Sequence, residues 1–258
     1  MKIPLGILIF WLVATFVAAW LSPNIIHLDH ILTAPNLVHW LGNDDLGRDI
    51  LARLFAGARV SLTIALTVTL VTFSVGTTIG LIAGYFGGWL DRVLMHITDV
   101  FLAFPGILLA IAFAAVLGSG VNNLILALCL TSWVGYARLT RAQTLALRGR
   151  QHVLAAQCLG ASTPRILLHH LLPLLLAPLL VEATFSIASL IIAEASLSFL
   201  GLGIQAPNAS WGAMLRDGTR YLLVAPHYVL AVGLSLMSLV LAVNMLGDAL
   251  RDRLDVRN

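Results

Sequence analysis

The sequence predicts an all-α integral membrane protein with six transmembrane helices. Hydrophobic residues occupy 59% of the 258 positions, charged residues only 10%, and the mean hydropathy is +0.95. Soluble domains carry about 25% charged residues, so this composition excludes an ordinary soluble enzyme or binding module. Long uncharged segments alternate with short polar ones, and a transmembrane helix needs about 20 mainly apolar residues. Two distant cysteines, Cys129 and Cys158, indicate neither a disulfide framework nor a metal cluster.

The first predicted span runs from about Ile3 to Leu21. Lys2 before it and the small residues near its end also allow a cleaved signal peptide. A membrane anchor is favoured, because the apolar run is longer than the core of a usual signal and because bulky Trp20 follows the small residues. A polar connector is expected at residues 22–58.

The second span is expected between Val60 and Leu90, a stretch without charge, followed by a short turn at Asp91 and Arg92. Four glycines recur at every fourth position within it. Small residues at this spacing let two helix backbones approach closely in lipid, so they predict a packing face within the bundle. These glycines are Gly76, Gly80, Gly84 and Gly88.

The stretch from Val100 to Ala137 is also uncharged but is too long for one span. Turn-forming residues at 118–123 divide it into a helical hairpin. Pro105 is expected to kink the first arm, which lipid-embedded helices tolerate. The hairpin arms and the elements after them are expected at about 97–117 and 122–138 (spans three and four), 139–172 (a polar insert), 174–196 (span five), 200–225 (a second connector) and 227–247 (span six).

Six spans place both termini on one side of the membrane, and the basic residues indicate which side. Ten of them share the side of the termini and the insert, and five lie on the other, so the positive-inside rule places the termini and the insert in the cytoplasm. The ten are Lys2, Arg92, Arg138, Arg141, Arg148, Arg150, Arg165, Arg251, Arg253 and Arg257, and the five are Arg48, Arg53, Arg59, Arg216 and Arg220. Two regions are expected: the first span with its connector (1–58) and a core of five spans (59–258).

The insert combines small and polar residues in an otherwise apolar chain. Alanine and leucine favour a helix from Arg141 to Leu159, and Gly160 is expected to end it with a positive φ. Thr163 and Pro164 are typical of the N-cap and first position of a second short helix, and Pro173 marks the entry to span five. This elbow has little side-chain bulk and fits a cleft in another protein; the alternative is an ordinary amphipathic surface loop.

The insert resembles the EAA loop of ABC importer permeases. In that pattern Glu-Ala-Ala is followed after three residues by Gly and, further on, by an apolar residue and Pro. The matching positions are Ala155-Ala156, Gly160 and Leu172-Pro173, while Leu154 replaces the usual Glu and His170 replaces a frequent Ile. Three more segments resemble the oligopeptide, dipeptide and nickel branch: His39–Asp49, Glu194–Gly203 with Ser210-Trp211-Gly212, and Gly247–Asp252. Asn43 replaces a usual Thr in the first of these segments, and Val256 replaces a usual Pro after the last.

The resemblance implies a type I ABC importer permease bundle that forms half of a translocation pore. The implied partners are a second homologous permease, two cytoplasmic ABC ATPase subunits, an external solute-binding protein and the lipid of a bacterial inner membrane, without nucleic acid. The chain has no P-loop, so ATP hydrolysis is expected on the partners, and no cofactor or metal is expected. The implied ATPase-coupling residues are Leu154, Ala155, Ala156, Gly160, Ala161, Ser162, Thr163, Leu172 and Pro173, and the implied structural motif contains Glu194, Gly201, Gly203, Trp211 and Gly212.

The only two glutamates fall in span five. Glu182 lies near mid-span, where an ionisable side chain usually faces a cavity or a partner. It is either a pore-lining residue that favours cationic solutes or a protonated packing residue. Glu194, at the outer end, is expected to be structural and to pair with an Arg of the outer connector. No pair among the eight histidines has the spacing of a strong metal site.

Short peptides are the expected solute, with nickel or a nickel chelate as the alternative. Two other classes are weighed against a permease. An ion-coupled transporter acting alone is expected to show internal repeats with paired broken helices. A membrane enzyme needs convergent His, Asp, Glu or Ser side chains at one depth. The sequence shows neither pattern.

Overall fold

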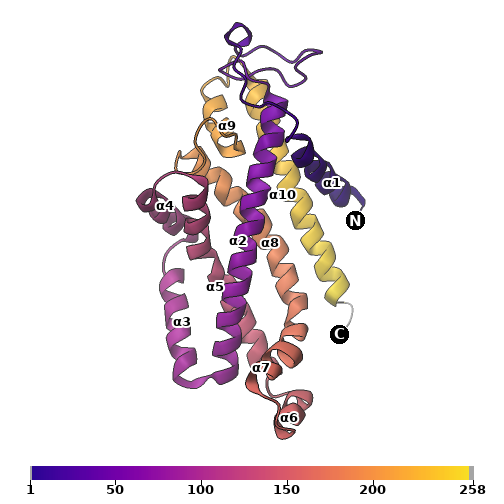
Figure 1. Cartoon of the computed structure of the whole chain (residues 1–258), viewed down its shortest axis with the longest axis vertical. Helices are drawn as coiled ribbons and strands as arrows, with labels where there is room; N and C mark the ends of the chain where they lie inside the picture. Colours follow the sequence, from indigo (N-terminus) through magenta and orange to yellow (C-terminus); the bar gives the residue numbers. More distant parts are fainter. Residues whose placement is uncertain (1, 256–258) are drawn as a thin grey trace. The chain divides into compact units, whose positions relative to one another are not determined.

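The computed structural model describes residues 2–255, which fold into helices joined by turns and two irregular connectors (Figure 1). Val256 and Arg257 lie outside the described residues. The elements in chain order are α1 (Lys2–Val17), η1 (Leu28–His30), α2 (Ile50–Phe86), α3 (Gly88–Leu102), α4 (Gly106–Leu117), α5 (Val121–Leu147), α6 (Gln151–Cys158), α7 (Thr163–Arg165), η2 (Ile166–Leu171), α8 (Leu172–Phe199), α9 (Trp211–Thr219) and α10 (Pro226–Asp255).

The chain forms two compact units, and each collects segments that are distant in the sequence. The division falls within the long helices α2, α5, α8 and α10, so each of these contributes to both units. Of the described residues, the first unit takes 2–67, 111–127 and 187–246, and the second takes 68–110, 128–186 and 247–255.

In the part of the chain that the structure describes, three helical stretches are long and apolar enough to cross a membrane: Ile50–Phe86, Thr163–Phe199 and Pro226–Leu254. A fourth candidate is the pair α3 and α4, which pass the same test only together and are bent by 84° at the break between them. The shorter apolar helix α1 ends at Val17 and does not reach the predicted Leu21. α5 has 27 residues, but asparagines near its start and arginines toward its end lower its mean hydropathy.

The turn after α2 lies at Gly87, so the predicted turn at Asp91 and Arg92 is wrong. Gly87 and Gly88 have φ values of +66° and +63°, a region that glycine enters because it has no Cβ. α3 begins at Gly88 and carries both charged residues inside it. α2 is also longer than predicted, because it already begins at Ile50.

The break near Pro105 is larger than the predicted kink. α3 ends at Leu102 and α4 begins at Gly106. Proline has no amide hydrogen and disfavours the helical region for the residue before it, which explains why the helix ends here instead of bending. Beyond the next turn, α5 continues to Leu147, past the predicted end of span four at 138.

Three of the four glycines at the predicted packing face lie against α5 within the second unit. A Cβ on any of them would lie 2.6–2.7 Å from a Cβ of α5; the pairs are Gly76–Tyr136, Gly80–Thr140 and Gly84–Thr144. Real Cβ atoms do not approach this closely, so the contact between the two backbones requires glycine. Gly88 has no such role: it follows the turn, and nothing lies within 4 Å of a Cβ there.

We predict that Gly80→Ala destabilises the protein. The new Cβ would lie 2.6 Å from Thr140 Cβ and 2.9 Å from the backbone nitrogen of Arg141, so two helices must separate. Overpacking of this kind costs about 1–3 kcal/mol. Thermal unfolding of the purified protein in detergent measures the effect. Gly233→Ala in α10 is the matched control, since nothing lies within 4 Å of its Cβ. Equal melting temperatures for the two variants would contradict this packing.

Candidate functional site

The predicted polar insert begins with a break in the helix. α5 ends at Leu147 and α6 begins at Gln151, with Arg150 in an extended conformation as its N-cap. The single helix predicted from Arg141 to Leu159 is therefore wrong. Gly149 lies in the break, and glycine destabilises a helix interior by about 1 kcal/mol relative to alanine.

The end of α6 forms a complete Schellman motif. Gly160 has a φ of +77°, which confirms the predicted positive φ. Its amide donates to the carbonyl of Gln157 at 2.9 Å, and the amide of Ala161 donates to the carbonyl of Ala156 at 3.0 Å. These two bonds satisfy carbonyls that the helix end leaves without partners. The shape of the turn is therefore fixed by the backbone itself.

The segment after the turn is continuous with α8, so the separate second helix that the sequence predicts is wrong. Ser162 is extended and serves as the N-cap in place of the predicted Thr163, and Pro164 follows in the first turn. The π-helical segment η2 leads directly into α8, and the stretch Thr163–Phe199 forms one candidate span. Pro173 is the second residue of α8, close to the predicted entry to span five, but η2 leads into it without a break. π-Helical segments often occur at functional sites.

One face of α6 is anchored in the hydrophobic core of the second unit. Val153 and Ala156 are three residues apart, hence on one face, and are 0% and 7% exposed. Val153 belongs to a cluster that joins α2, α5, α6, η2 and α8, which we call the loop core. Its buried members are Leu81, Tyr136, Leu147, Val153, Ile166, Leu171, Leu175 and Leu179. The elbow therefore shares one core with the long helices of its unit.

The other sides of α6 are exposed and carry Leu154 and Ala155 beside the polar Gln151 and His152, and the exposed C-cap residue Leu159 follows the helix. Leu154 is 46% exposed and Leu159 is 87% exposed. Residues 148–165 include no acidic residue, and both Arg150 and Arg165 are exposed. The elbow therefore presents two exposed leucines on a surface that carries basic but no acidic side chains.

The remaining predicted loop residues are divided between the surface and the loop core. Ala155, Gly160, Ser162 and Pro173 are exposed, Thr163 is half-buried, and Ala161 and Leu172 pack against the loop core. The exposed members at 155, 160 and 162 add little side-chain bulk around the two exposed leucines. This arrangement suits insertion of the elbow into a cleft.

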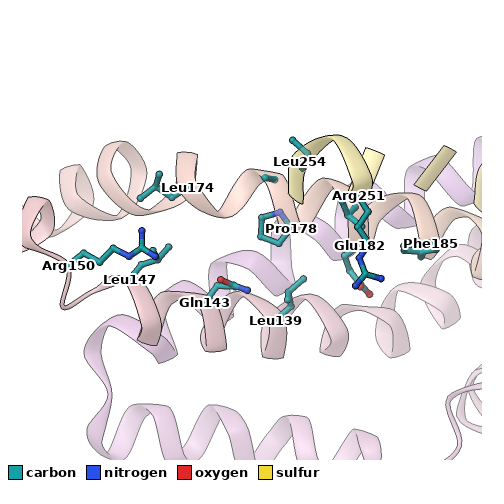
Figure 2. A pocket seen from close by; sticks show the side chains of 12 residues that line it. Leu139, Gln143, Leu147, Arg150, Leu174, Pro178, Glu182, Phe185, Arg251 and Leu254 are labelled. Atoms are coloured by element: carbon teal, nitrogen blue, oxygen red, sulfur yellow. The ribbon is translucent and has the colours of Figure 1, made fainter. Parts of the chain in front are cut away.

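A cavity of about 610 Å³ lies in the second unit, lined by α5, the break after it, α8 and the end of α10 (Figure 2). The predicted residue Glu182 lines it, together with Leu174 and Pro178 of the same helix. Because Pro178 has no amide hydrogen, the carbonyl of Leu174 loses its helical partner and is left as an acceptor. The charged and amide side chains of the lining are Gln143, Arg150, Glu182 and Arg251. The cavity therefore offers both signs of charge.

Sequence reasoning missed the cavity residues other than Glu182. Two runs with a spacing of four residues line the cavity: Leu139, Gln143 and Leu147 on α5, and Leu174, Pro178 and Glu182 on α8. This spacing identifies one face of each helix, so the neighbours of Glu182 on α8 were predictable. The faces of α5 and α10 that lie against them could not be predicted from the sequence.

Glu194 is buried in the first unit and is held by hydroxyl groups. Its side chain is 0% exposed. Ser61 Oγ donates to Oε2 at 2.6 Å, and Ser198 Oγ donates to Oε1 at 2.9 Å. The prediction that Glu194 pairs with an Arg is therefore wrong, because serines satisfy both of its oxygens. Gly201, from the same predicted motif, follows the end of α8 with a φ of +82°.

The rest of that motif packs tightly around Ser198. A Cβ on Gly203 would lie 2.9 Å from Ser198 Cα, and a Cβ on Gly212 would lie 2.8 Å from Ser198 Cβ. Trp211 is fully buried, and its Nε1 donates to the carbonyl of Leu54 at 2.9 Å. The motif thus joins the second connector to α8 and α2 within the first unit.

The first connector is fixed by buried polar contacts in the same unit. Arg48 Nε donates to the fully buried carboxylate of Asp44 at 2.7 Å. Burial raises the pKa of the neighbouring Asp45, and the charge of Asp44 adds to the effect. His39 Nδ1 lies 2.7 Å from Asp49 Oδ2. Contacts between its own charged side chains therefore help to hold the segment His39–Asp49 in place.

Within residues 2–255, no three His, Cys, Asp or Glu side chains gather closely enough to hold a metal ion. His27, His30 and His39 form a row in the first connector, with ring centroids 6.3 and 6.1 Å apart. Their rings contact each other, and His39 also contacts Asp49; they are not arranged as ligands of a metal ion.

Residues 76–257 match the family described as binding-protein-dependent transport system inner membrane component. The match covers more than half of the chain, and the chain belongs to this family. It is a multi-pass inner membrane protein and the permease subunit of an ABC importer, and thus a translocation subunit.

Among its relatives are the glutathione transport system permease proteins GsiD of Escherichia coli O157:H7 and Shigella sonnei (strain Ss046). Each is 45% identical over 259 residues, which covers 99% of this chain and 85% of the relative. Solved structures of the MetNI methionine ABC transporter in inward-facing conformations share the fold. One has 20% identity and a TM-score of 0.64 over 78% of this chain and 95% of that one; a second has 21% identity and a TM-score of 0.61. The predicted type I importer fold is confirmed.

We predict that Glu194→Ala destabilises the protein, because it leaves the hydroxyls of two buried serines without their acceptor. Loss of a buried partner costs about 1–3 kcal/mol. Glu194→Gln keeps an acceptor oxygen and is expected to cost less. Thermal unfolding in detergent measures both. Glu182→Ala, at the other glutamate, is the control and is expected to have a much smaller effect, since its side chain lines a cavity. Equal losses for the two alanine variants would contradict the structural role of Glu194.

Proposed function

We propose that the elbow formed by α6 and the Gly160 turn is the coupling helix through which ATPases drive this permease. The observation that carries the proposal is that α6 buries one face in the unit's core while its other sides, with Leu154, are exposed. A second homologous permease completes the pore, two ABC ATPase subunits bind in the cytoplasm, and an external binding protein delivers the solute. ATP hydrolysis takes place on the ATPases.

The elbow can transmit movement because no flexible segment separates it from α8. Backbone hydrogen bonds fix the Gly160 turn, and Thr163–Phe199 is one continuous helical stretch. When the ATPases close on ATP, they carry the elbow with them, and α8 moves as part of the same body. Rigid elements that shift between two packed arrangements are a common basis of such switching.

The docking surface is apolar where the family pattern has a Glu. Leu154 of α6 and its C-cap residue Leu159 are the exposed leucines of this surface, and Arg150 and Arg165 lie at the two ends of the elbow. The matching ATPase cleft is therefore apolar at its centre and acidic at its rim. Apolar contact supplies affinity, and the charged border fixes orientation.

Both termini and the elbow lie in the cytoplasm in this proposal. The bias of basic residues supports it, as does the placement of Arg150 and Arg165 beside the docking face. The predicted regions 1–58 and 59–258 then serve as an anchor with its outer connector and as the permease core.

The proposed solutes are short peptides, and the cavity lined by Glu182 is part of their path. A peptide with a free amino terminus carries an ammonium group, and the cavity offers Glu182 as its partner. The relatives named for glutathione transport support a peptide-type solute.

We predict that Leu154→Asp separates ATP hydrolysis from transport, because a charge at the centre of the docking face must be desolvated in the cleft. Its half-exposed position allows the variant to fold. Solute uptake per ATP hydrolysed, measured with the complete complex in proteoliposomes, is expected to fall about tenfold, the scale of 1.4 kcal/mol. Gly160→Glu should do the same, although its positive φ also strains the turn. Leu223→Asp, at a 99% exposed leucine of the outer connector, is the control. Wild-type uptake by both elbow variants would rule out docking at this face.

We predict that Glu182→Gln weakens transport of peptides with a free amino terminus. Loss of one charge-assisted hydrogen bond should raise KM about tenfold. Acetylated peptides, which lack the ammonium group, should show the same KM in both proteins. Uptake of the two peptide forms by the reconstituted complex makes the comparison. An unchanged preference between them would remove Glu182 from the solute path.

A further inference from the structure

We propose that the α2–α3 turn (Phe86–Gly88) is bound to the coupling segment, which comprises the break after α5 together with α6 (residues 148–158), and moves with it. The ATPases then drive two elements, α8 and the α2–α3 turn. Arg148 and Gln157 are the positioning residues of this attachment. The inference rests on the proposed coupling role of α6. All the contacts that support it lie within the second unit.

Arg148 binds the end of α2 from the break that leads into α6. Its Nη1 donates to the carbonyl of Gly84 at 3.0 Å and to the carbonyl of Tyr85 at 3.2 Å. The last carbonyls of a helix have no partner within it, and a positive side chain there also interacts favourably with the helix dipole. A Cβ on Gly87 would lie 3.3 Å from Nη1, so glycine at this position also leaves room for the guanidinium.

A second contact joins α6 itself to α2. Gln157 Nε2 donates to Tyr85 Oη at 3.3 Å. The ring of Tyr85 packs against the loop core, which also contains Val153 of α6. Tyr85 therefore contacts the coupling segment in three ways: its ring through the loop core, its hydroxyl through Gln157 and its carbonyl through Arg148.

A third contact joins α3 to α5 just beyond the turn. The guanidinium of Arg141 binds both oxygens of Asp91, with Nη2 2.7 Å from Oδ2. The side chains are only 33% and 15% exposed. A two-point geometry between planar groups resists rotation as well as separation. Both helices that flank the turn are thus bound to the end of α5.

Tight packing prevents sliding between these elements. A Cβ on Gly84 would lie 2.7 Å from Thr144 Cβ and 2.9 Å from the carbonyl oxygen of Arg141. Close-packed interfaces of this kind shift between discrete arrangements rather than deforming gradually. The end of α5, the turn and α6 therefore behave as one body when the elbow is displaced.

The first test removes Arg148 and measures coupling in the complete complex in proteoliposomes. Arg148→Ala is expected to lower solute uptake per ATP hydrolysed about tenfold, the loss of roughly one charge-assisted contact, with the ATPase rate within about twofold of wild type. Arg148→Lys keeps a charged donor and should restore part of the coupling. Arg138→Ala, at an exposed arginine of α5, is the control and should match wild type. Normal uptake per ATP in Arg148→Ala would overturn the inference.

The second test remains informative if Arg148→Ala does not fold. Tyr85→Cys and Gln157→Cys, combined with Cys129→Ser and Cys158→Ser, allow a cleavable bifunctional thiol reagent to bridge the two positions. If the turn and α6 move together, bridged complexes transport at the rate seen after the bridge is reduced. Arrest by the bridge, reversed on reduction, would show that the two parts move relative to each other and would overturn the inference.

The Leu154→Asp variant separates the two proposals. Uncoupling by Leu154→Asp together with normal coupling in Arg148→Ala rejects the attachment of the turn alone. Normal coupling in both variants rejects the role of α6 itself.

Discussion

The burial of Val153 in the loop core is the constraint on which the elbow depends. α6 has eight residues, and isolated helices shorter than about 12–15 residues are marginal in water. Its helical form and its position therefore come from tertiary contacts: Val153 and Ala156 on the inner face, and the Gly160 turn at its end. Because the inner face is fixed in this way, the outer face with Leu154 and Leu159 has a defined orientation.

The same helix that begins at the elbow also lines the cavity. Thr163 and Glu182 belong to one helical stretch, so a displacement at the turn reaches the cavity without crossing a loop. The π-helical segment η2 and Pro178 lie between them and interrupt the regular pattern of hydrogen bonds. The helical stretch nevertheless continues through both, and Pro178 is itself part of the cavity wall.

The sequence identifies the class of fold and the elbow because both depend on local patterns. Uncharged stretches reveal helices, and Gly160 reveals the turn. The turn at Asp91 and the end of α5 are misplaced because charged residues do not by themselves end a helix. The helices end instead beside glycines, at Gly87-Gly88 and just before Gly149. The sequence also assigns the wrong partner to Glu194, because Ser61 is distant in sequence. The contacts of Arg148 with α2 are equally non-local, and no spacing rule predicts them.

The most direct measurement of the central claim uses the exposed native Cys158 of α6. In the complete complex with Cys129→Ser, a photoreactive thiol reagent attached to Cys158 reports what lies against the elbow. If the elbow is the coupling helix, the reagent captures an ATPase subunit, from the cytoplasmic side only, with a yield that changes when ATP is bound. Capture of lipid alone, or labelling of Cys158 from the external side, would contradict it.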